Sequence, residues 1–258
     1  MESPIVHGFV GGLLAGLATG IGALGVYAVR RLSAAANDVL LSTAAGIMLA
    51  AAFFSLLAPG IEAALANGSG RAGAAALVSA GVLAGAGVLA LVHRLVPHEH
   101  FTVGREGPEA LHVRRMWLFV LAITLHNLPE GMAVGVGFGA GDVTSGIPLA
   151  IGIGLQNVPE GLAVATSLAS IGYAPARAFA LSLATGLLEA VGALFGAVAA
   201  AVAGALLPAA LAFAAGAMLF VITSEIIPET ARDENKSATT FSLLAGFLAM
   251  MGLDVALG

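Results

Sequence analysis

The sequence predicts an all-α fold that crosses a membrane several times. Hydrophobic residues make up 59% of the 258 residues and charged residues only 10%, and the mean hydropathy is +1.00. Soluble domains carry about 25% charged residues, so the composition indicates an integral membrane protein. The apolar runs reach the roughly 20 residues that a helix needs to cross a bilayer, whereas barrel strands are about half as long and alternate in polarity.

The apolar runs are separated where Gly, Pro and charged residues interrupt them, and this division predicts eight transmembrane helices. They span residues 5–29, 39–65, 74–96, 116–140, 145–171, 176–203, 208–231 and 237–257. The only long connection is the loop at residues 97–115. We therefore expect one transmembrane domain over residues 1–258.

Other features of the composition exclude some classes of protein. The chain has no cysteine, so it can form neither disulfides nor thiolate metal sites. The N-terminus, MESPIVHGFV, lacks the basic segment of a cleavable signal, so we expect the first apolar run to remain in the mature protein. A net charge of -5 gives no indication of nucleic-acid binding.

The distribution of Lys and Arg predicts the orientation. Nine of the ten lie in odd-numbered loops or next to them: Arg30, Arg31, Arg94, Arg105, Arg114, Arg115, Arg177, Arg232 and Lys236. Only Arg71 lies in an even-numbered loop. Because cytoplasmic loops are enriched in basic residues, we expect the loop at 97–115 in the cytoplasm and both termini on the opposite side.

Short sequence matches indicate an internal repeat. LATG occurs at 17–20 and 183–186, AAGIML at 44–49 matches AAGAML at 214–219, and LAG occurs at 83–85 and 244–246. The matches fall in order, which predicts that spans 1–3 and 6–8 are duplicated three-helix units. The three spans of the first unit and the two intervening spans make five, an odd number, so the second unit enters the membrane from the opposite side. Inverted repeats around a central pair, here spans 4 and 5, are typical of transporters.

The central pair carries a polar motif twice, HNLPEG at 126–131 and QNVPEG at 156–161. On a helix, the first and fifth positions of each motif share a face. Pro129 and Pro159 each lack an N–H and displace the carbonyl four residues earlier. Polar groups of this kind are tolerated at membrane depth only where they line a cavity or bind something.

Acidic residues in the spans predict the kind of ligand. Glu130, Glu160, Glu189 and Glu225 lie within spans, and no span interior holds a Lys or Arg to pair with them. A lone carboxylate at mid-membrane costs at least about 2.5 kcal/mol. Carboxylates, an imidazole and amide oxygens without thiolate suit a divalent first-row metal such as zinc, manganese or ferrous iron. The sequence thus predicts that the missing counter-ion is a bound metal.

The doubled motif, Glu189, the run MLFVITSEIIPET in span 7 and the His-containing loop after span 3 resemble the ZIP (Zrt-, Irt-like protein) family of metal transporters, of the bacterial GufA-like type. The resemblance covers essentially the whole chain. It implies eight transmembrane helices, a homodimer in the bacterial inner membrane, and metal transport toward the cytoplasm. It also implies a binuclear metal centre and an elevator-like shift of spans 1, 4, 5 and 6 against the rest.

The resemblance also assigns metal ligands. One metal would be held by His126, Glu130, Gln156 and Glu160, with the thioether of Met48 nearby. A second would be held by Asn127, Asn157 and Glu189, with Glu130 and Glu160 bridging. Two positions depart from the family pattern: Asn157 stands where close relatives often have Asp, and Ser224 where some have His. The first departure puts the second metal in doubt, and the second weakens a role for Ser224 and Glu225 in metal release.

Several polar residues outside the motif have a simpler interpretation. We expect Asp38, Glu62 and Asp254 to be solvated at span ends. Glu225 and Glu229, beside Pro228, either release metal or face water. The group of His93, His98, Glu99, His100 and His112 either captures emerging metal or is an ordinary exposed loop. Met48 alone is more typical of apolar packing than of ligation. Glycines at 8, 12, 16 and 20 predict close packing of the first span.

Other functional classes fit the sequence less well. An intramembrane zinc protease needs HExxH, whereas this chain has a single His in HNxxE. GAGD at 139–142 suggests an aspartyl protease, but no second mid-span Asp completes a dyad. A metal channel lined by the same ligands is the closest alternative, although a cage with many ligands favours slower, carrier-type transport. The sequence predicts no enzyme activity and no resident cofactor, with zinc, cadmium, iron or manganese as the bound substrate.

Overall fold

The computed structural model describes residues 3–29, 31–95, 98–99, 105–106, 115–139, 143–170, 172–202, 207–230 and 236–257. Its long helices are α1 (Pro4–Ala23), α2 (Ala34–Ala50), α4 (Arg71–Leu95), α5 (Arg115–Gly139), α6 (Val143–Ser170), α7 (Pro175–Val202), α8 (Leu207–Val221) and α10 (Lys236–Leu257). Shorter helical pieces extend three of them without a break: η1 (Leu24–Tyr27) after α1, η2 (Ala51–Leu57) and α3 (Ala58–Ala66) after α2, and η4 (Ile222–Ile226) and α9 (Ile227–Thr230) after α8.

Helices occupy all eight predicted ranges, with ends that differ by at most five residues. In the described part of the chain, seven helical stretches are long and apolar enough to cross a membrane. The prediction of a polytopic, helical membrane protein is therefore confirmed. One feature was not predicted: the loop at 97–115 contains a short antiparallel hairpin of β1 (His98–Glu99) and β2 (Arg105–Glu106), with His98 opposite Glu106. Two-residue strands are too short to leave a period in the sequence.

Local sequence signals set several helix ends. The Ser3 hydroxyl accepts a hydrogen bond from the Ile5 N–H at the start of α1. In the same way, Ser33 accepts one from the Ala36 N–H at the start of α2. Gly68 after α3 and Gly172 after α6 adopt φ of 87° and 103°, which only glycine adopts without strain.

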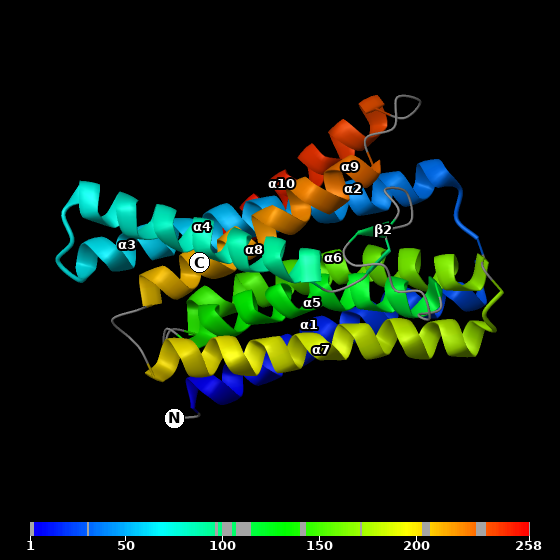
Figure 1. Ribbon diagram of the computed structural model, residues 1–258, viewed down its shortest axis with the longest axis horizontal. Coiled ribbons are helices and arrows are strands. Elements are labelled where there is room, and N and C mark those ends of the chain that lie inside the picture. The colour runs from blue at the N-terminus through cyan, green and yellow to red at the C-terminus, as the bar shows by residue number, and fades with distance from the viewer. Residues whose placement is uncertain are drawn as a thin grey trace.

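The helices form two groups (Figure 1). α1, α5, α6 and α7 pack on one another, and we call them the four-helix bundle. In the second helix group, α10 packs along α2 and α4 packs along α8. A hydrophobic core joins the groups: it contains Phe138, Leu149 and Ile153 from the bundle and Met48 and Met218 from the second group. This arrangement places the centres of α5 and α6 against α1 and α7 on one side and the second group on the other.

Glycines allow the bundle to pack tightly. A Cβ added at the glycines 8, 12, 16 or 20 of α1 would collide with α7, whose contacting residues there are Ala197, Ala193, Gly186 and Leu183. The predicted packing role of this glycine stripe is confirmed. It matters for the site because it brings the backbones of α1 and α7 close to the two polar motifs.

Candidate metal site in the four-helix bundle

The two polar motifs lie near the middle of α5 and α6, and each helix continues through its motif proline, Pro129 in α5 and Pro159 in α6. The glycine that ends each motif allows the backbone of a neighbouring helix to approach closely. A Cβ at Gly131 would overlap the backbone of Glu189 in α7, and a Cβ at Gly161 would overlap the backbone of Thr19 in α1. The Pro-Glu-Gly sequence thus places a carboxylate next to a position where another helix backbone makes contact.

These helices gather a buried polar cluster. Asn127 and Glu130 from α5, Gln156 and Asn157 from α6, and Glu189 from α7 are all at most 1% exposed. Glu160 of α6 is half-buried. Six of the eight predicted ligands are thus brought together by three helices, α5, α6 and α7.

Glu189 is the point where α5, α6 and α7 are linked. Its Oε1 accepts a hydrogen bond of 2.7 Å from Asn157 Nδ2 and one of 3.3 Å from Asn127 Nδ2. The same Asn157 nitrogen donates to the backbone carbonyl of Ala15 in α1, at 2.8 Å. One asparagine therefore connects three helices of the bundle.

Glu130 belongs to the other half of the cluster. Gln156 Nε2 donates to Glu130 Oε2 and to Asn157 Oδ1, both at 2.8 Å. Glu160 lies close enough for its charge to act on both Glu130 and Glu189. Three carboxylates thus share one buried site.

The sequences of the bundle helices contain no Lys or Arg near these carboxylates. Arg115 at the start of α5 and Arg177 at the start of α7 are the only Lys or Arg in α1, α5, α6 and α7. Burying like charges together is strongly unfavourable unless a cation or hydrogen-bond donors compensate. The amide donors compensate in part, and a divalent cation would supply the rest.

The described buried atoms of the cluster that lack a hydrogen-bond partner are all carboxylate or amide oxygens. Among the described side chains, four buried oxygens of the cluster have no hydrogen-bond partner: Asn127 Oδ1, Glu130 Oε1, Gln156 Oε1 and Glu189 Oε2. Buried polar atoms are normally satisfied, and carboxylate and amide oxygens are ligands for divalent metals. The chemistry of the donor set fits a metal ion as substrate.

Two of the predicted ligands are not placed in the cluster. His126 precedes Asn127 in α5, and its side chain lies outside the described residues. Met48 is 1% exposed and belongs to the hydrophobic core with Ile153, so its role as a ligand stays a prediction. In the described part of the chain, no three His, Asp or Glu side chains form a ready metal-binding group. Ligation by the cluster therefore requires the amides or His126.

Three predictions about other polar residues are wrong. Asp38 is fully buried rather than solvated, because α2 begins at Ala34, five residues earlier than predicted, and includes Asp38. Asp254 is half-buried and accepts a 2.6 Å hydrogen bond from Ser55 of η2. His93 is 4% exposed and stacks edge-on against Phe220, so it is part of α4 and not of the loop. In contrast, Glu62 is exposed as predicted.

Most of the residues predicted to release or capture metal have side chains that the structure does not describe. The side chains of His98, Glu99, Glu225 and Glu229 are not described, and His100 and His112 lie outside the described residues. Ser224 donates to the Phe220 carbonyl in its own helix, at 2.6 Å. Sequence reasoning missed the Ala15 carbonyl, because a backbone acceptor leaves no signal in residue type.

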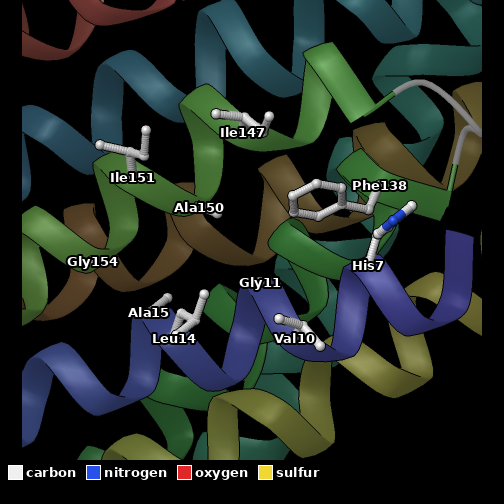
Figure 2. Close-up of a pocket in the computed structure, with 10 residues that line it drawn as sticks. All are labelled: His7, Val10, Gly11, Leu14, Ala15, Phe138, Ile147, Ala150, Ile151 and Gly154. Carbon is white, nitrogen blue, oxygen red and sulfur yellow. The ribbon is translucent and has the colours of Figure 1, made fainter. Parts of the chain in front are cut away.

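A groove of about 450 Å³ lies beside the cluster, between α1 and α6. In Figure 2, Val10 and Leu14 of α1 face Ile147 and Ile151 of α6, and His7 lies at the end near Phe138. Ala15, whose carbonyl binds Asn157, lines the same groove. The lining is almost entirely apolar, so this groove offers a metal ion at most one imidazole. The polar cluster is the better metal site.

Comparison with known proteins agrees with this chemistry. A family described as ZIP zinc transporter matches residues 98–254, more than half of the chain. The chain belongs to the ZIP family. Zinc transporter ZIPB of Bordetella bronchiseptica is 45% identical over 98% of this chain and 82% of its own length. Zinc transporter GufA of Myxococcus xanthus is 46% identical over 97% of this chain and 99% of its own.

More distant ZIP proteins are also similar. Human zinc transporter ZIP11 is 35% identical over 86% of this chain and 88% of its own length. The predicted resemblance to GufA-like ZIP proteins is confirmed. Family and relatives alike are named as transporters, in agreement with the prediction that this ZIP protein is not an enzyme.

Proposed function

We propose that this protein carries divalent metal ions, zinc first, across the membrane toward the cytoplasm. The observation that carries the proposal is the cluster of buried Glu130 and Glu189 and half-buried Glu160, with amide oxygens free to bind. Apart from Arg115 and Arg177 near the starts of α5 and α7, the bundle helices contain no Lys or Arg. The names of ZIPB and GufA support zinc as the substrate. Cadmium, iron and manganese are secondary substrates because the same donors accept them.

The ligands of the transported metal are His126 and Glu130 from α5 and Gln156 and Glu160 from α6, with Met48 of α2 as a further contact. Glu130 Oε1 and Gln156 Oε1 are both buried and available. The resemblance also implies a second ion at Asn127, Asn157 and Glu189, bridged by Glu130 and Glu160.

The inverted repeat is supported by matching helix contacts. A Cβ at Gly46 in α2 would meet Leu243 of α10, and a Cβ at Gly216 in α8 would meet Val82 of α4. Adding 170 to Gly46 gives Gly216, and subtracting 161 from Leu243 gives Val82, the offsets of the sequence matches. The α2 and α10 pair is thus related to the α8 and α4 pair as an inverted repeat requires.

A second correspondence lies in the backbone. Both repeats contain a π-helical segment, η2 from Ala51 and η4 from Ile222, which begin 222 − 51 = 171 residues apart. A proline follows each segment, Pro59 in α3 and Pro228 in α9, 228 − 59 = 169 residues apart. Such widened turns are rare and often occur at functional sites, so their shared position supports a duplicated unit.

The two helix groups suggest how transport proceeds. All of the cluster lies in the four-helix bundle, and the apolar core joins this bundle to the second group. We infer an elevator-like movement in which spans 1, 4, 5 and 6 move as one body and carry the metal past the second group. The eight-span domain over residues 1–258 forms a homodimer in the bacterial inner membrane, with both termini outside and the loop at 97–115 in the cytoplasm.

The test is metal uptake into proteoliposomes that contain the purified protein, with zinc, cadmium, manganese and iron compared. A carrier saturates at low metal concentration, whereas a channel lined by the same ligands keeps conducting as concentration rises. Loss of uptake in Glu130→Ala and Glu160→Ala, with folding intact, is the expected result. Uptake that ignores both substitutions would place the cation pathway elsewhere.

A further inference from the structure

Asn157 makes hydrogen bonds to the protein through both of its N–H donors and through its oxygen. Its Nδ2 donates to Glu189 Oε1 at 2.7 Å and to the Ala15 carbonyl at 2.8 Å, and its Oδ1 accepts from Gln156 Nε2 at 2.8 Å. A side-chain amide has two N–H donors, and only its oxygen can bind a metal. Both donors are in use, and the oxygen already has a partner. Asn157 therefore has little left to offer a metal ion.

Asn157 nevertheless stabilises Glu189 in the way that a cation at the same place would. Glu189 is fully buried, and the donors on its Oε1 are the amides of Asn157 and Asn127. N–H donors directed at a carboxylate stabilise its charge in the way that a bound cation does. The amide also extends to Ala15 in α1, so this stabilisation holds α1, α6 and α7 together without a metal.

The charge of the cluster and the hydrogen-bond partners of Asn157 both favour a single ion. Three carboxylates and one dication leave a net charge of −3 + 2 = −1, which the two amides on Glu189 can offset, whereas two dications leave +1 without an anion. The four buried oxygens without partners come from Asn127, Glu130, Gln156 and Glu189. Glu130 and Gln156, two of the proposed zinc ligands, are among them, whereas Asn157 is not.

We propose that Asn157 takes the place of a second cation, so that the cluster binds one dication and Asn157 acts as a positioning residue rather than a ligand. This inference rests on the proposed function, because it concerns the same cluster. It departs from the two-ion centre that the family resemblance implies. It also predicts that one substitution, Asn157→Asp, creates a second metal position by removing both N–H donors and adding a carboxylate.

The test is the number of zinc ions bound per chain, measured by equilibrium dialysis and elemental analysis of the purified, full-length protein in detergent. Wild type is expected to bind one zinc and Asn157→Asp two. Asn37→Asp, which makes the same change of charge at the cytoplasmic end of α2, is the matched control and is expected to stay at one.

Glu130→Ala is expected to lose the single ion. Thermal melting with and without zinc reports folding, and the zinc-induced shift in Tm is expected to be larger in Asn157→Asp.

The outcomes separate the two proposals. Two zinc ions in wild type, with loss in Glu130→Ala, would overturn the role of Asn157 and leave the transport site intact. One zinc in both wild type and a folded Asn157→Asp would also overturn it. No zinc in wild type, or binding indifferent to Glu130→Ala, would overturn the metal site itself. If Asn157→Asp does not fold, the count in wild type still decides between one ion and two.

Discussion

The two copies of the Pro-Glu-Gly motif have almost the same sequence but different surroundings. In the α5 copy, Glu130 is fully buried, and Asn127 makes a single, long hydrogen bond of 3.3 Å to Glu189. In the α6 copy, Glu160 is half-buried, and Asn157 makes three hydrogen bonds of 2.8 Å or less. The α5 copy thus contributes the buried carboxylate, and the α6 copy contributes the amides that hold the bundle together.

The difference shows that a repeated motif need not have a repeated role. Each copy meets a different helix, since Gly131 contacts α7 and Gly161 contacts α1. α7 brings Glu189 into the site, whereas α1 brings only backbone. The asparagine of the second copy is therefore bound to protein at its oxygen and both donors, whereas Asn127 Oδ1 of the first copy has no partner among the described residues.

The largest expected effect is on transport. Removing the buried carboxylate in Glu130→Ala should lower zinc uptake by about 100-fold or more, because a metal ligand is lost where water cannot replace it. Glu160→Ala should lower uptake by about tenfold, since Glu160 is only half-buried and water can replace its carboxylate more easily. Initial rates in proteoliposomes measure both. Equal losses would mean that the two motifs contribute alike.

Substitution of the motif glycines, Gly131 and Gly161, should cause the next largest effect, a loss of folding stability. Gly131→Leu or Gly161→Leu places a side chain into a neighbouring backbone and should destabilise the fold by about 3 kcal/mol or more. Gly154→Ala on α6 is the control, because its Cβ would lie 3.7 Å from the nearest atom, Ala15 Cα. Thermal melting in detergent measures the change. A stable Gly161→Leu would show that α1 does not need to approach α6 closely.

The two asparagines should differ in stability. Asn157→Ala removes three hydrogen bonds and should cost about 2 kcal/mol, whereas Asn127→Ala removes one long bond and should cost well under about 1 kcal/mol. Denaturant or thermal unfolding without metal gives both values. The reverse order would contradict the structural role assigned to the α6 copy.

The smallest expected effect concerns the first position of each motif, which is His126 in α5 and Gln156 in α6. It is a change in the pH dependence of zinc binding. An imidazole binds metal only when it has lost its proton, so zinc binding should weaken by about tenfold from pH 7 to pH 5. His126→Gln makes the motifs alike and should flatten this dependence above the range in which the glutamates titrate. Zinc binding by wild type and His126→Gln, measured from pH 7 to pH 5, tests whether His126 is a ligand. An unchanged pH profile in the variant would remove His126 from the ligands.

Much of the fold was predictable because its signals are local. Long apolar runs separated by Gly, Pro and charge placed every helix, for instance α7 at Pro175–Val202 against a predicted 176–203. The doubled motif pointed to the cluster because carboxylates without basic partners are rare in membrane spans. Asp38 and His93 were misjudged because burial near a helix end depends on which neighbour covers it.

The sequence by itself determined that this is a helical membrane protein, where its helices lie, and which side chains are candidates for binding metal. These properties follow from hydropathy and residue type along the chain. Only the tertiary structure decided that Glu189 meets both motifs, that Glu130 is fully buried while Glu160 is half-buried, and that Asn157 is bound to Ala15. The physical reason is that these contacts join helices distant in sequence, and a backbone carbonyl or a close helix crossing leaves no trace in the residues that it meets.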